Sequence, residues 1–432
     1  MQIPELYKLF LQHPSVETDT RKLKHGDLFF ALKGPNYNAN LFAQQAIAAG
    51  AAYAIVDEVT GEPNERIIKV QDVLATLQAL ALHHREKLTV NKDGKNVPFI
   101  AITGSNGKTT SKELLHVVLS TTYKTYATEG NLNNHIGIPL TLLKIKDDVE
   151  MAIIEMGANH LKEIEGYCKY AMPTHGIITN CGKAHLEGFG GIEGIRKGKG
   201  ELFDYLKEHD GTAFIMNDYD YIVSMSAGIK KIISYGTQEA DVTGLVKQSS
   251  GLLEVEIKNN NHLSSIKTNL VGEYNLPNIL LAVTVGRYFN VGEEKIKTAI
   301  EGYHPSNSRS QLILKDSNRI ILDAYNANPS SMKAAIENFA KMDAADKILF
   351  LGGMKELGPD SLLEHQLLID LVKKYSWKQV ILVGSEFDKT THPYIHLQNS
   401  DEAMQWFKSG HIKNATLLIK GSRSTRMEKV LE

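Results

Sequence analysis

The chain has 432 residues, a length that predicts about three domains. With 42% hydrophobic and 23% charged residues, its composition is that of an ordinary globular protein without low-complexity tracts. The 48 basic and 50 acidic residues give a formal net charge of -2. This balance argues against a general nucleic-acid surface, so local basic groups must hold any anionic ligand.

Neither the cysteines nor the N-terminal segment indicates an exported or membrane protein. Cys168 and Cys181 are too few for a disulfide framework and lack a paired metal-binding spacing, so we expect buried thiols in a reducing compartment. Residues 1–22 lack the apolar core of a signal peptide, and no apolar run approaches the length of a membrane span. We therefore expect a cytoplasmic protein with no membrane span.

A small α/β domain is predicted for residues 1–95. Residues 26–32 have a short strand pattern, and residues 41–58 read as a helix that runs into a second strand. Residues 72–88 have apolar side chains at three- and four-residue spacing, which predicts a helix. The polar stretch 89–98 is interpreted as a linker.

Beyond the linker, strands alternate with helical segments, which predicts a parallel sheet covered on both faces. An antiparallel section is expected at 240–272, where apolar and polar residues alternate, and a helix at 275–289. The candidate strands of this second domain are 98–103, 151–157, 175–182 and 212–217.

A second boundary is predicted near 302–311, a segment rich in turn-forming residues. The strands that follow each end in a glycine or a polar turn, so we expect a doubly wound third domain whose ligands bind beyond the carboxyl ends of the strands. These candidate strands are 319–329, 346–354, 379–385 and 415–424.

The segment "TGSNGKTT" (103–110) follows the first strand of the second domain and precedes a helix. Gly104 and Gly107 allow the backbone N–H groups to turn toward an anion, and the start of the helix adds a positive dipole end. Lys108 can reach the outer phosphates of a nucleotide, and the Thr109 hydroxyl can ligate Mg²⁺. The alternative is a plain strand-to-helix turn in which these residues serve as caps. The predicted ATP-binding residues of the loop are Gly104, Ser105, Asn106, Gly107, Lys108, Thr109 and Thr110.

This loop departs from the common pattern G-x-x-x-x-G-K-[ST], because Ile102 stands where that pattern has its first glycine. The shortened form T-G-x-x-G-K-T-T resembles that of the Mur ligase and folylpolyglutamate synthetase superfamily. Further segments occur in the order of the Mur ligases that add D-alanyl-D-alanine: "GNLNNHIGIPLTLL" (130–143), "EMGANHLKEI" (155–164), "TNCGKAHLEGFG" (179–190), "DAYNANPSSM" (323–332), "LGGMKELG" (351–358) and "KGSRSTRME" (420–428).

This resemblance covers essentially the whole chain and implies an ATP-dependent amide ligase of peptidoglycan precursor synthesis. Members join D-alanyl-D-alanine to UDP-N-acetylmuramoyl-tripeptide through an acyl phosphate, and release ADP and phosphate. The implied architecture is α/β in three domains: a UDP-sugar-binding N-terminal domain (1–95), a central P-loop ATPase domain (96–305) and a Rossmann-like C-terminal domain (306–432). We expect a monomer.

The resemblance also implies a metal-dependent catalytic centre with ATP and, we expect, two Mg²⁺ ions. Glu155 is the implied metal ligand beside Thr109, although an isolated glutamate of this kind is as a rule a capping or surface residue, and His185 is the implied ligand of a second Mg²⁺. A lysine of the family is carbamylated and so becomes a carboxylate-like metal ligand, and its pattern falls on Lys199 rather than Lys197. Two solvated lysines are the alternative at these positions.

For the nucleotide, the resemblance places Asn278 near adenine, Arg309 near the γ-phosphate, Asp323 near ribose and Asn326 against the nucleotide. The family has glycine before the arginine, where this chain has Ser308. The predicted catalytic residues are Lys108, Glu155, His185, Lys199 and Arg309.

The substrate residues that the resemblance implies are spread over all three domains. Thr20 and Arg21 belong to a segment that binds the UDP-sugar, and three asparagines would line the path of the muramyl peptide. Turn formation is the alternative for these asparagines. Lys420 and Arg423 would bind the free carboxylate of the acceptor dipeptide, and a solvated basic turn is the alternative for these two cations. The full set is Thr20, Arg21, Asn131, Asn133, Asn134, Tyr325, Asn328, Lys420 and Arg423.

Three alternatives to this function remain at this point. A sister ligase that adds one amino acid, or a folylpolyglutamate synthetase-like enzyme, would use another amine acceptor. A P-loop kinase would release ADP without any amine, and a nucleotide-gated binding module would bind ATP without releasing phosphate.

Overall fold

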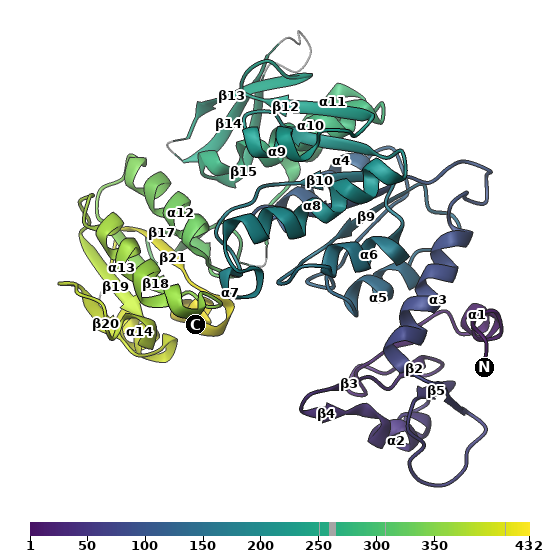
Figure 1. Cartoon of the computed structure of the whole chain (residues 1–432). Helices are drawn as coiled ribbons and strands as arrows, with labels where there is room; N and C mark the ends of the chain where they lie inside the picture. The colour runs from purple at the N-terminus through teal and green to yellow at the C-terminus, as the bar shows by residue number, and fades with distance from the viewer. Residues whose placement is uncertain (250, 259–264, 307, 411) are drawn as a thin grey trace.

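The computed structural model describes residues 1–249, 251–258, 265–306, 308–410 and 412–432. The strands of these residues form three larger sheets, which lie in three lobes that follow one another along the chain (Figure 1). The three-domain α/β architecture is therefore confirmed. In the described residues, no helix is both long and apolar enough to cross a membrane.

The first lobe is built on a small parallel sheet in the order β1-β2-β5-β6. Its elements are α1 (Ile3–Gln12), β1 (Val16–Glu17), β2 (Leu28–Phe30), β3 (Lys33–Gly34), β4 (Tyr37–Asn38), η1 (Ala39–Phe42), α2 (Ala43–Ala48), β5 (Tyr53–Val56), β6 (Ile67–Lys69) and α3 (Val73–Lys87). The predicted strands and helices of this segment are present, and the apolar stretch of β2 is fully buried.

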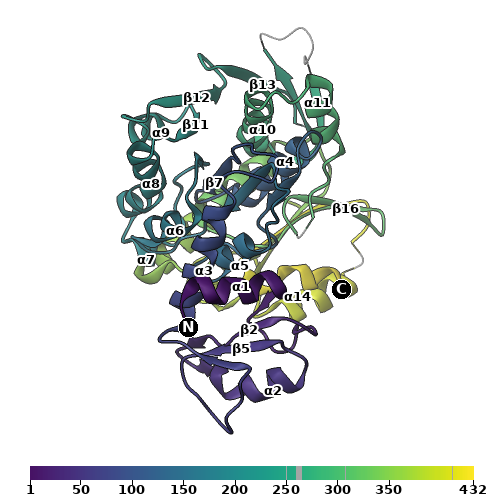
Figure 2. The ribbon, with the colours of Figure 1, turned by 90° about the vertical axis from the view of Figure 1, so that its right-hand side faces the viewer.

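The helix α3 leaves the first lobe and packs against the second (Figures 1 and 2). Buried Arg85 donates to the carbonyl oxygens of Ala171 and Met172 at distances of 2.9 and 2.8 Å, and its guanidinium carbon lies 3.5 Å from the centroid of the Phe99 ring. Residues 89–98, which were expected to be a linker, form a turn closed by a bridge between Val90 and Asn96. The domain boundary at residue 95 stays a prediction.

The second lobe holds a nine-stranded sheet in the order β15-β14-β13-β12-β11-β10-β7-β9-β8. The predicted antiparallel section is present in β13 to β15, while residues 250 and 259–264 of that segment lie outside the described residues. The elements of this lobe are β7 (Phe99–Thr103), α4 (Lys108–Leu119), β8 (Thr125–Ala127), α5 (Gly137–Leu143), β9 (Met151–Glu155), α6 (Glu163–Ala171), β10 (His175–Ile178), α7 (Leu186–Phe189), α8 (Ile192–Glu208), β11 (Thr212–Met216), α9 (Asp220–Met225), β12 (Lys231–Gly236), β13 (Val242–Gln248), β14 (Leu252–Ile257), β15 (Ser265–Val271), η2 (Glu273–Asn275), α10 (Leu276–Tyr288) and α11 (Glu293–Gly302).

The central strand β7 has apolar residues on both faces, as a strand covered by helices on both sides requires. Ile100 and Ile102 pack with α4 and α10, while Phe99 and Ala101 face the core that includes α3, α6 and α8. β7 lies between β9 and β10, and all three strands are parallel. Their carboxyl ends, and the loops that follow, therefore meet at one edge of the sheet.

The third lobe contains a six-stranded sheet in the order β16-β17-β21-β18-β19-β20, parallel except for β16. Helices α12 and α13 cover one face, and α14 with η6 covers the other. Its elements are β16 (Gln311–Lys315), β17 (Asn318–Asp323), α12 (Pro329–Lys341), β18 (Lys347–Gly352), η3 (Gly358–Asp360), α13 (Ser361–Val372), β19 (Gln379–Val383), η4 (Ser385–Phe387), β20 (Ile395–Leu397), α14 (Ser400–Ser409), β21 (Thr416–Lys420), η5 (Arg423–Thr425) and η6 (Met427–Leu431).

Candidate active site

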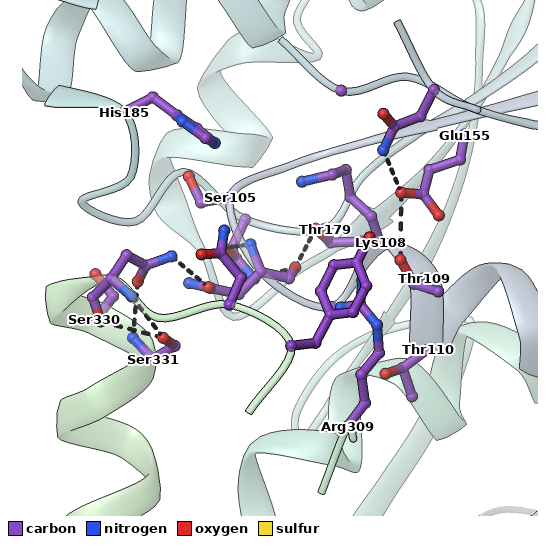
Figure 3. Close-up of a pocket in the computed structure, with 18 of the residues that line it drawn as sticks. Ser105, Lys108, Thr109, Thr110, Glu155, Thr179, His185, Arg309, Ser330 and Ser331 are labelled. Atoms are coloured by element: carbon purple, nitrogen blue, oxygen red, sulfur yellow. Dashed lines mark hydrogen bonds between the residues drawn. The ribbon is translucent and has the colours of Figure 1, made fainter. Parts of the chain in front are cut away.

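A cavity of about 670 Å³ lies where the second and third lobes meet. Its walls come from the loop after β7, the ends of β9 and β10, the start of α10 and the third-lobe residues that follow Arg309. Figure 3 shows the side chains of this cavity converging from both lobes. None of residues 1–95 lines it.

The loop of residues 103–110 requires glycine at two positions. Gly104 has φ +143°, and a Cβ atom there would lie 1.9 Å from the Thr179 hydroxyl oxygen. Gly107 has φ +84°, and a Cβ atom there would lie 2.8 Å from Oδ1 of Asn278. Both positions lie in the left-handed region that favours glycine. The tight turn lets α4 begin at Lys108 with its N-terminus on the cavity.

Lys108 folds back over this loop and donates from Nζ to the carbonyl oxygen of Gly104 at 2.5 Å. Desolvation lowers the pKa of Lys108, and the nearby Arg309 lowers it further, while the charge of Glu155 raises it. The lysine therefore lies in a partly desolvated site among other charges, where its attraction for a phosphate group is strong.

Glu155 ends β9 beside the loop and is buried. Its Oε1 accepts hydrogen bonds from the Asn133 side-chain amide at 2.8 Å and from the Thr109 hydroxyl at 3.2 Å (Figure 3). Its Oε2 is buried and has no hydrogen-bond partner. A buried carboxylate oxygen without a partner, next to a threonine hydroxyl, is a donor set that suits a hard divalent cation. The residues present therefore fit Mg²⁺.

Lys199 lies on α8 and is only 1% exposed, whereas Lys197 on the same helix is exposed. Its Nζ lies 5.3 Å from the centroid of the Phe189 ring. Burial, together with the charge of Lys108, lowers the pKa of Lys199 to about 7. A large fraction of this amine is therefore neutral near pH 7 and available as a nucleophile.

His185 approaches the cavity from the segment before α7, where its own φ is +54°. Its Nδ1 contacts the carboxylate of Glu356 in the third lobe. This contact lowers the pKa of Glu356. A carboxylate that orients one ring nitrogen of a histidine is a common arrangement around metal-binding histidines.

Arg309 enters the cavity from the third lobe, and its guanidinium carbon lies 3.6 Å from the centroid of the Tyr325 ring. The Nε of Arg309 is buried without a hydrogen-bond partner. Arg423 lies near the same ring, with its guanidinium carbon 5.0 Å from the centroid. Ser308 has φ +56°, so the serine adopts a conformation that glycine reaches more easily.

Comparison with known proteins identifies the family. Residues 102–286 match the Mur ligase middle domain, and residues 308–423 match the family described as "Mur ligase, glutamate ligase domain". The UDP-N-acetylmuramoyl-tripeptide–D-alanyl-D-alanine ligase of Bacillus subtilis is 33% identical, over 100% of this chain and 96% of that protein. The chain belongs to the Mur ligase family.

Further relatives agree with this assignment. The Escherichia coli protein of the same name as the Bacillus relative is 32% identical, over 96% of this chain and 92% of its own length. A crystal structure of MurF from Acinetobacter baumannii matches with a TM-score of 0.85 at 30% identity, and covers 96% of this chain and 92% of that one. The MurF ligase from Thermotoga maritima in complex with ADP matches with a TM-score of 0.84 at 26% identity, and covers 98% of this chain and 97% of that one.

The cavity of this Mur ligase brings together most of the residues singled out from the sequence. Four lie outside its lining: Thr20 and Arg21 are in the first lobe, Gly104 supports the loop from behind, and Lys199 is buried in α8. The predicted residues that line the cavity are Ser105, Asn106, Gly107, Lys108, Thr109, Thr110, Asn131, Asn133, Asn134, Glu155, His185, Asn278, Arg309, Asp323, Tyr325, Asn326, Asn328, Lys420 and Arg423.

Several of these side chains already have protein partners. Nζ of Lys420, a residue only 2% exposed, donates to Oδ2 of Asp323 at 2.5 Å. These residues, expected at the acceptor and at the ribose, stand opposite each other because β17 and β21 are paired in register there. Asn278 accepts from the Ser111 hydroxyl at 3.1 Å and donates to Asn275 at 2.9 Å, so it braces the start of α4.

Two further predicted substrate residues have local partners. Oδ1 of Asn134 accepts from the backbone N–H groups of Ile136 and Gly137, so the turn-forming alternative describes its contacts. The exposed side chain of Arg21 donates from Nε and Nη2 to the Asp19 carboxylate at 2.9 and 2.7 Å.

The loop after β10 lies in one of the family segments (179–190), but no site role was predicted for Thr179 or Asn180. Oδ1 of Asn180 accepts from the backbone N–H of Asn106 at 3.1 Å, and the Thr179 hydroxyl donates to the Asn106 carbonyl oxygen at 2.6 Å. These residues hold the phosphate-loop backbone in place. The signal was present, because polar residues at the carboxyl end of a neighbouring parallel strand belong to the same sheet edge.

Proposed function

We propose that this chain uses ATP to join D-alanyl-D-alanine to UDP-N-acetylmuramoyl-tripeptide and releases ADP and phosphate. The observation that carries this function is the cavity in which a phosphate-binding loop, a buried carboxylate and third-lobe arginines meet. The names of the relatives support the same substrates, since the chain aligns with them over nearly their whole length.

In the proposed first step, a carboxylate oxygen of the tripeptide attacks the γ-phosphorus of ATP and ADP leaves. The product is an acyl phosphate. Lys108 and Arg309 approach the cavity from different lobes, so they are suited to hold the γ-phosphate between them and to balance the charge that gathers there. In the second step the neutral amine of D-alanyl-D-alanine attacks the acyl carbon, and phosphate leaves as the amide forms.

We propose that Glu155 and Thr109 hold Mg²⁺, and that His185, with Lys199 as a carbamate, serves a second ion. Bound Mg²⁺ would supply positive charge to the phosphate oxygens. The amine of Lys199 is suited to carbamylation because its lowered pKa leaves the nitrogen lone pair free to attack CO₂, with loss of one proton. The burial of Lys199 supports its choice over Lys197.

For the acceptor, Arg423 is the better candidate to bind the free carboxylate of D-alanyl-D-alanine, because the charge of Lys420 is already balanced by Asp323. We propose that Thr20 and Arg21 bind the UDP end in a domain of residues 1–95, followed by domains 96–305 and 306–432. We also propose a monomer and a cytoplasmic site of action, where ATP is supplied.

The test is an assay of phosphate release with ATP, Mg²⁺ and UDP-N-acetylmuramoyl-tripeptide, run with lysine and with diaminopimelate as the third residue. We expect release that depends on D-alanyl-D-alanine, together with a pentapeptide product identified by mass spectrometry. ADP release without any amine would indicate a kinase. Turnover with a single amino acid instead of the dipeptide would indicate a sister ligase.

A further inference from the structure

The second and third lobes contact each other through the loop after β10, where Lys183 has no role in the proposed chemistry. The backbone N–H of Lys183 donates to the hydroxyl of Ser330 on α12 at 2.9 Å. Nζ of Lys183 donates to Oε1 of Glu364 on α13 at 2.6 Å, and Glu364 is buried. A single residue of the second lobe thus binds the N-terminal turns of two third-lobe helices.

The same loop holds the phosphate-binding loop on its other side. The Ser105 hydroxyl donates to the carbonyl oxygen of Gly182 at 2.7 Å, and the Ser105 N–H donates to the carbonyl oxygen of Asn180 at 2.9 Å. The approach to α12 is close, because a Cβ atom on Gly182 would lie 2.8 Å from the Ser330 hydroxyl. Figure 3 shows Ser105 and Ser330 on neighbouring ribbons of the two lobes.

The phosphate-binding loop also contacts the third lobe directly. Nδ2 of Asn328, the N-cap of α12, donates to Oδ1 of Asn106 in the phosphate-binding loop at 2.8 Å. Residues 180–183 therefore contact α12 and α13 on one side and the phosphate-binding loop, which would hold ATP, on the other. Arg309 and Arg423 both belong to the third lobe, so the position of this lobe determines where these cations lie relative to the phosphate-binding loop.

We propose that Lys183 and Glu364 are positioning residues that seat the third lobe on the phosphate-binding loop, so that the acceptor is presented to the activated carboxylate. Neither side chain needs to touch a substrate. The pair acts through the orientation of Arg423, so its loss weakens use of the acceptor more than binding of the nucleotide. This inference rests on the proposed ligase function.

The test is charge reversal across the pair: Lys183→Glu, Glu364→Lys and the double variant, with Lys183→Met and Glu364→Gln as neutral partners. Each reversal is expected to raise the KM for D-alanyl-D-alanine by about tenfold, because like charges then face each other. The dissociation constant of ADP should stay within about twofold, because the loop keeps its own hydrogen bonds. The double variant should return the KM to within about threefold of the parent value.

Lys247→Glu is the matched control. Lys247 and Glu254 lie 2.9 Å apart, with side-chain exposures of 55% and 13% against 50% and 8% for Lys183 and Glu364, but both belong to the second lobe. This variant should leave the KM for the acceptor unchanged. Small-angle X-ray scattering with bound ADP should give a larger radius of gyration for Lys183→Glu than for the parent or the control.

Pentapeptide formation by the parent enzyme tests the ligase function separately. If the parent makes pentapeptide, an unchanged acceptor KM in the folded reversal variants overturns the positioning role. An equal rise in the control, or a double variant no better than the singles, overturns it as well. Circular dichroism identifies any variant that fails to fold. If Glu364→Lys is one of these, Lys183→Glu and the neutral variants decide the outcome by the same KM comparison.

Discussion

Glu155 has one carboxylate oxygen bound by Thr109 and Asn133 and another that is buried without a partner. The hydrogen bonds to the first oxygen orient the side chain, and the second oxygen is the one that we propose binds Mg²⁺. A carboxylate in this state is costly to bury unless a cation completes it. A substitution of Glu155 can therefore distinguish an effect on the proposed metal binding from an effect on folding.

Glu155→Gln is expected to lower phosphate release by at least about a thousandfold, because the amide keeps the shape and the hydrogen bonds but loses the charge that binds the cation. The unfolding temperature should not fall, since the amide can accept the same two hydrogen bonds and a carboxylate oxygen that is buried without a partner is removed. Glu165→Gln, at an exposed ion pair of α6, is the matched control and should keep full turnover. Near-normal turnover of Glu155→Gln would remove Glu155 from the metal site.

Tyr325 supports Arg309 through ring stacking. Tyr325→Leu is expected to lower turnover about tenfold, because a cation on an aromatic face is stabilised by about 0.5–2 kcal/mol. Tyr325→Phe keeps the ring and should stay within about twofold of the parent. Equal losses in both variants would indicate that the hydroxyl matters instead of the stack. Steady-state kinetics at saturating acceptor distinguishes the two outcomes.

The site residues that could be predicted from the sequence are those that belong to a contiguous motif. The loop glycines, Lys108 and Thr109 lie next to one another in the chain, and Glu155 is recognisable as the end of a buried strand. The contacts of Asn180 with Asn106 and of Lys183 with Glu364 depend on strand order and lobe placement, which no local pattern specifies. The pairing of Lys420 with Asp323 likewise follows from a register between strands 97 residues apart.

At the scale of elements, an aromatic cluster surrounds His175 at the start of β10. Its ring packs against Phe214, Tyr288 and Phe289, with centroid distances of 6.0, 5.6 and 5.2 Å. Burial, with a smaller effect from the charge of Lys231, lowers the pKa of His175 to about 4 from its usual 6.5. The folded protein therefore resists protonation of this histidine.

Between pH 6.5 and about 4 the unfolded chain binds a proton that the folded His175 does not, so the free energy of unfolding falls as the pH falls through this window. His175→Phe should flatten that fall, so the stability of the variant relative to the parent should be about 3 kcal/mol higher at pH 4 than at pH 7. Urea unfolding at pH 7 and pH 4 measures the difference. Substitution of the exposed His25 by Phe is the control, and an identical pH slope in parent and His175→Phe would contradict the expectation.

Strands with continuous apolar runs, such as β7, β9, β18 and β21, were predictable because their side chains are buried on both faces. The strands that were missed are short or partly exposed. β8 and β20 have three residues each, and β12 begins with exposed residues. Their strand conformation depends on pairing with a neighbouring strand. This is a tertiary effect, which the β-propensity of the residues does not predict.

At the scale of the whole molecule, α3 joins the first lobe to the second. Arg85→Met is expected to lower the free energy of unfolding by about 2–3 kcal/mol, because two carbonyl oxygens at the end of α6 lose a charged donor. Arg85→Lys should recover little of this loss, since one ammonium does not match the geometry of the planar guanidinium. Urea unfolding measures both variants, and the exposed Arg66→Met is the control.

The number of lobes and their order were predictable from length, turn-rich segments and strand patterns, because each lobe forms its own sheet. The path of α3 was not, since a helix with apolar residues on two sides gives no sign of which neighbour it packs against. Placement of the lobes depends on contacts such as those of Arg85 and Lys183, which are single side chains in otherwise ordinary segments.

The packing of α3 against both the first and the second lobe bears on the length of the substrate that the enzyme accepts. Its 15 residues span about 22 Å, and the helix packs against α5 and α6 of the second lobe. In the proposed function, in which the first lobe binds the UDP end, this helix sets the distance between the binding sites for the two ends of the donor. Each amino acid of the stem peptide adds at most about 3.5 Å of reach. In the proposed function, a donor one residue shorter would therefore not reach the phosphoryl group, and the enzyme would discriminate against donors with an incomplete peptide.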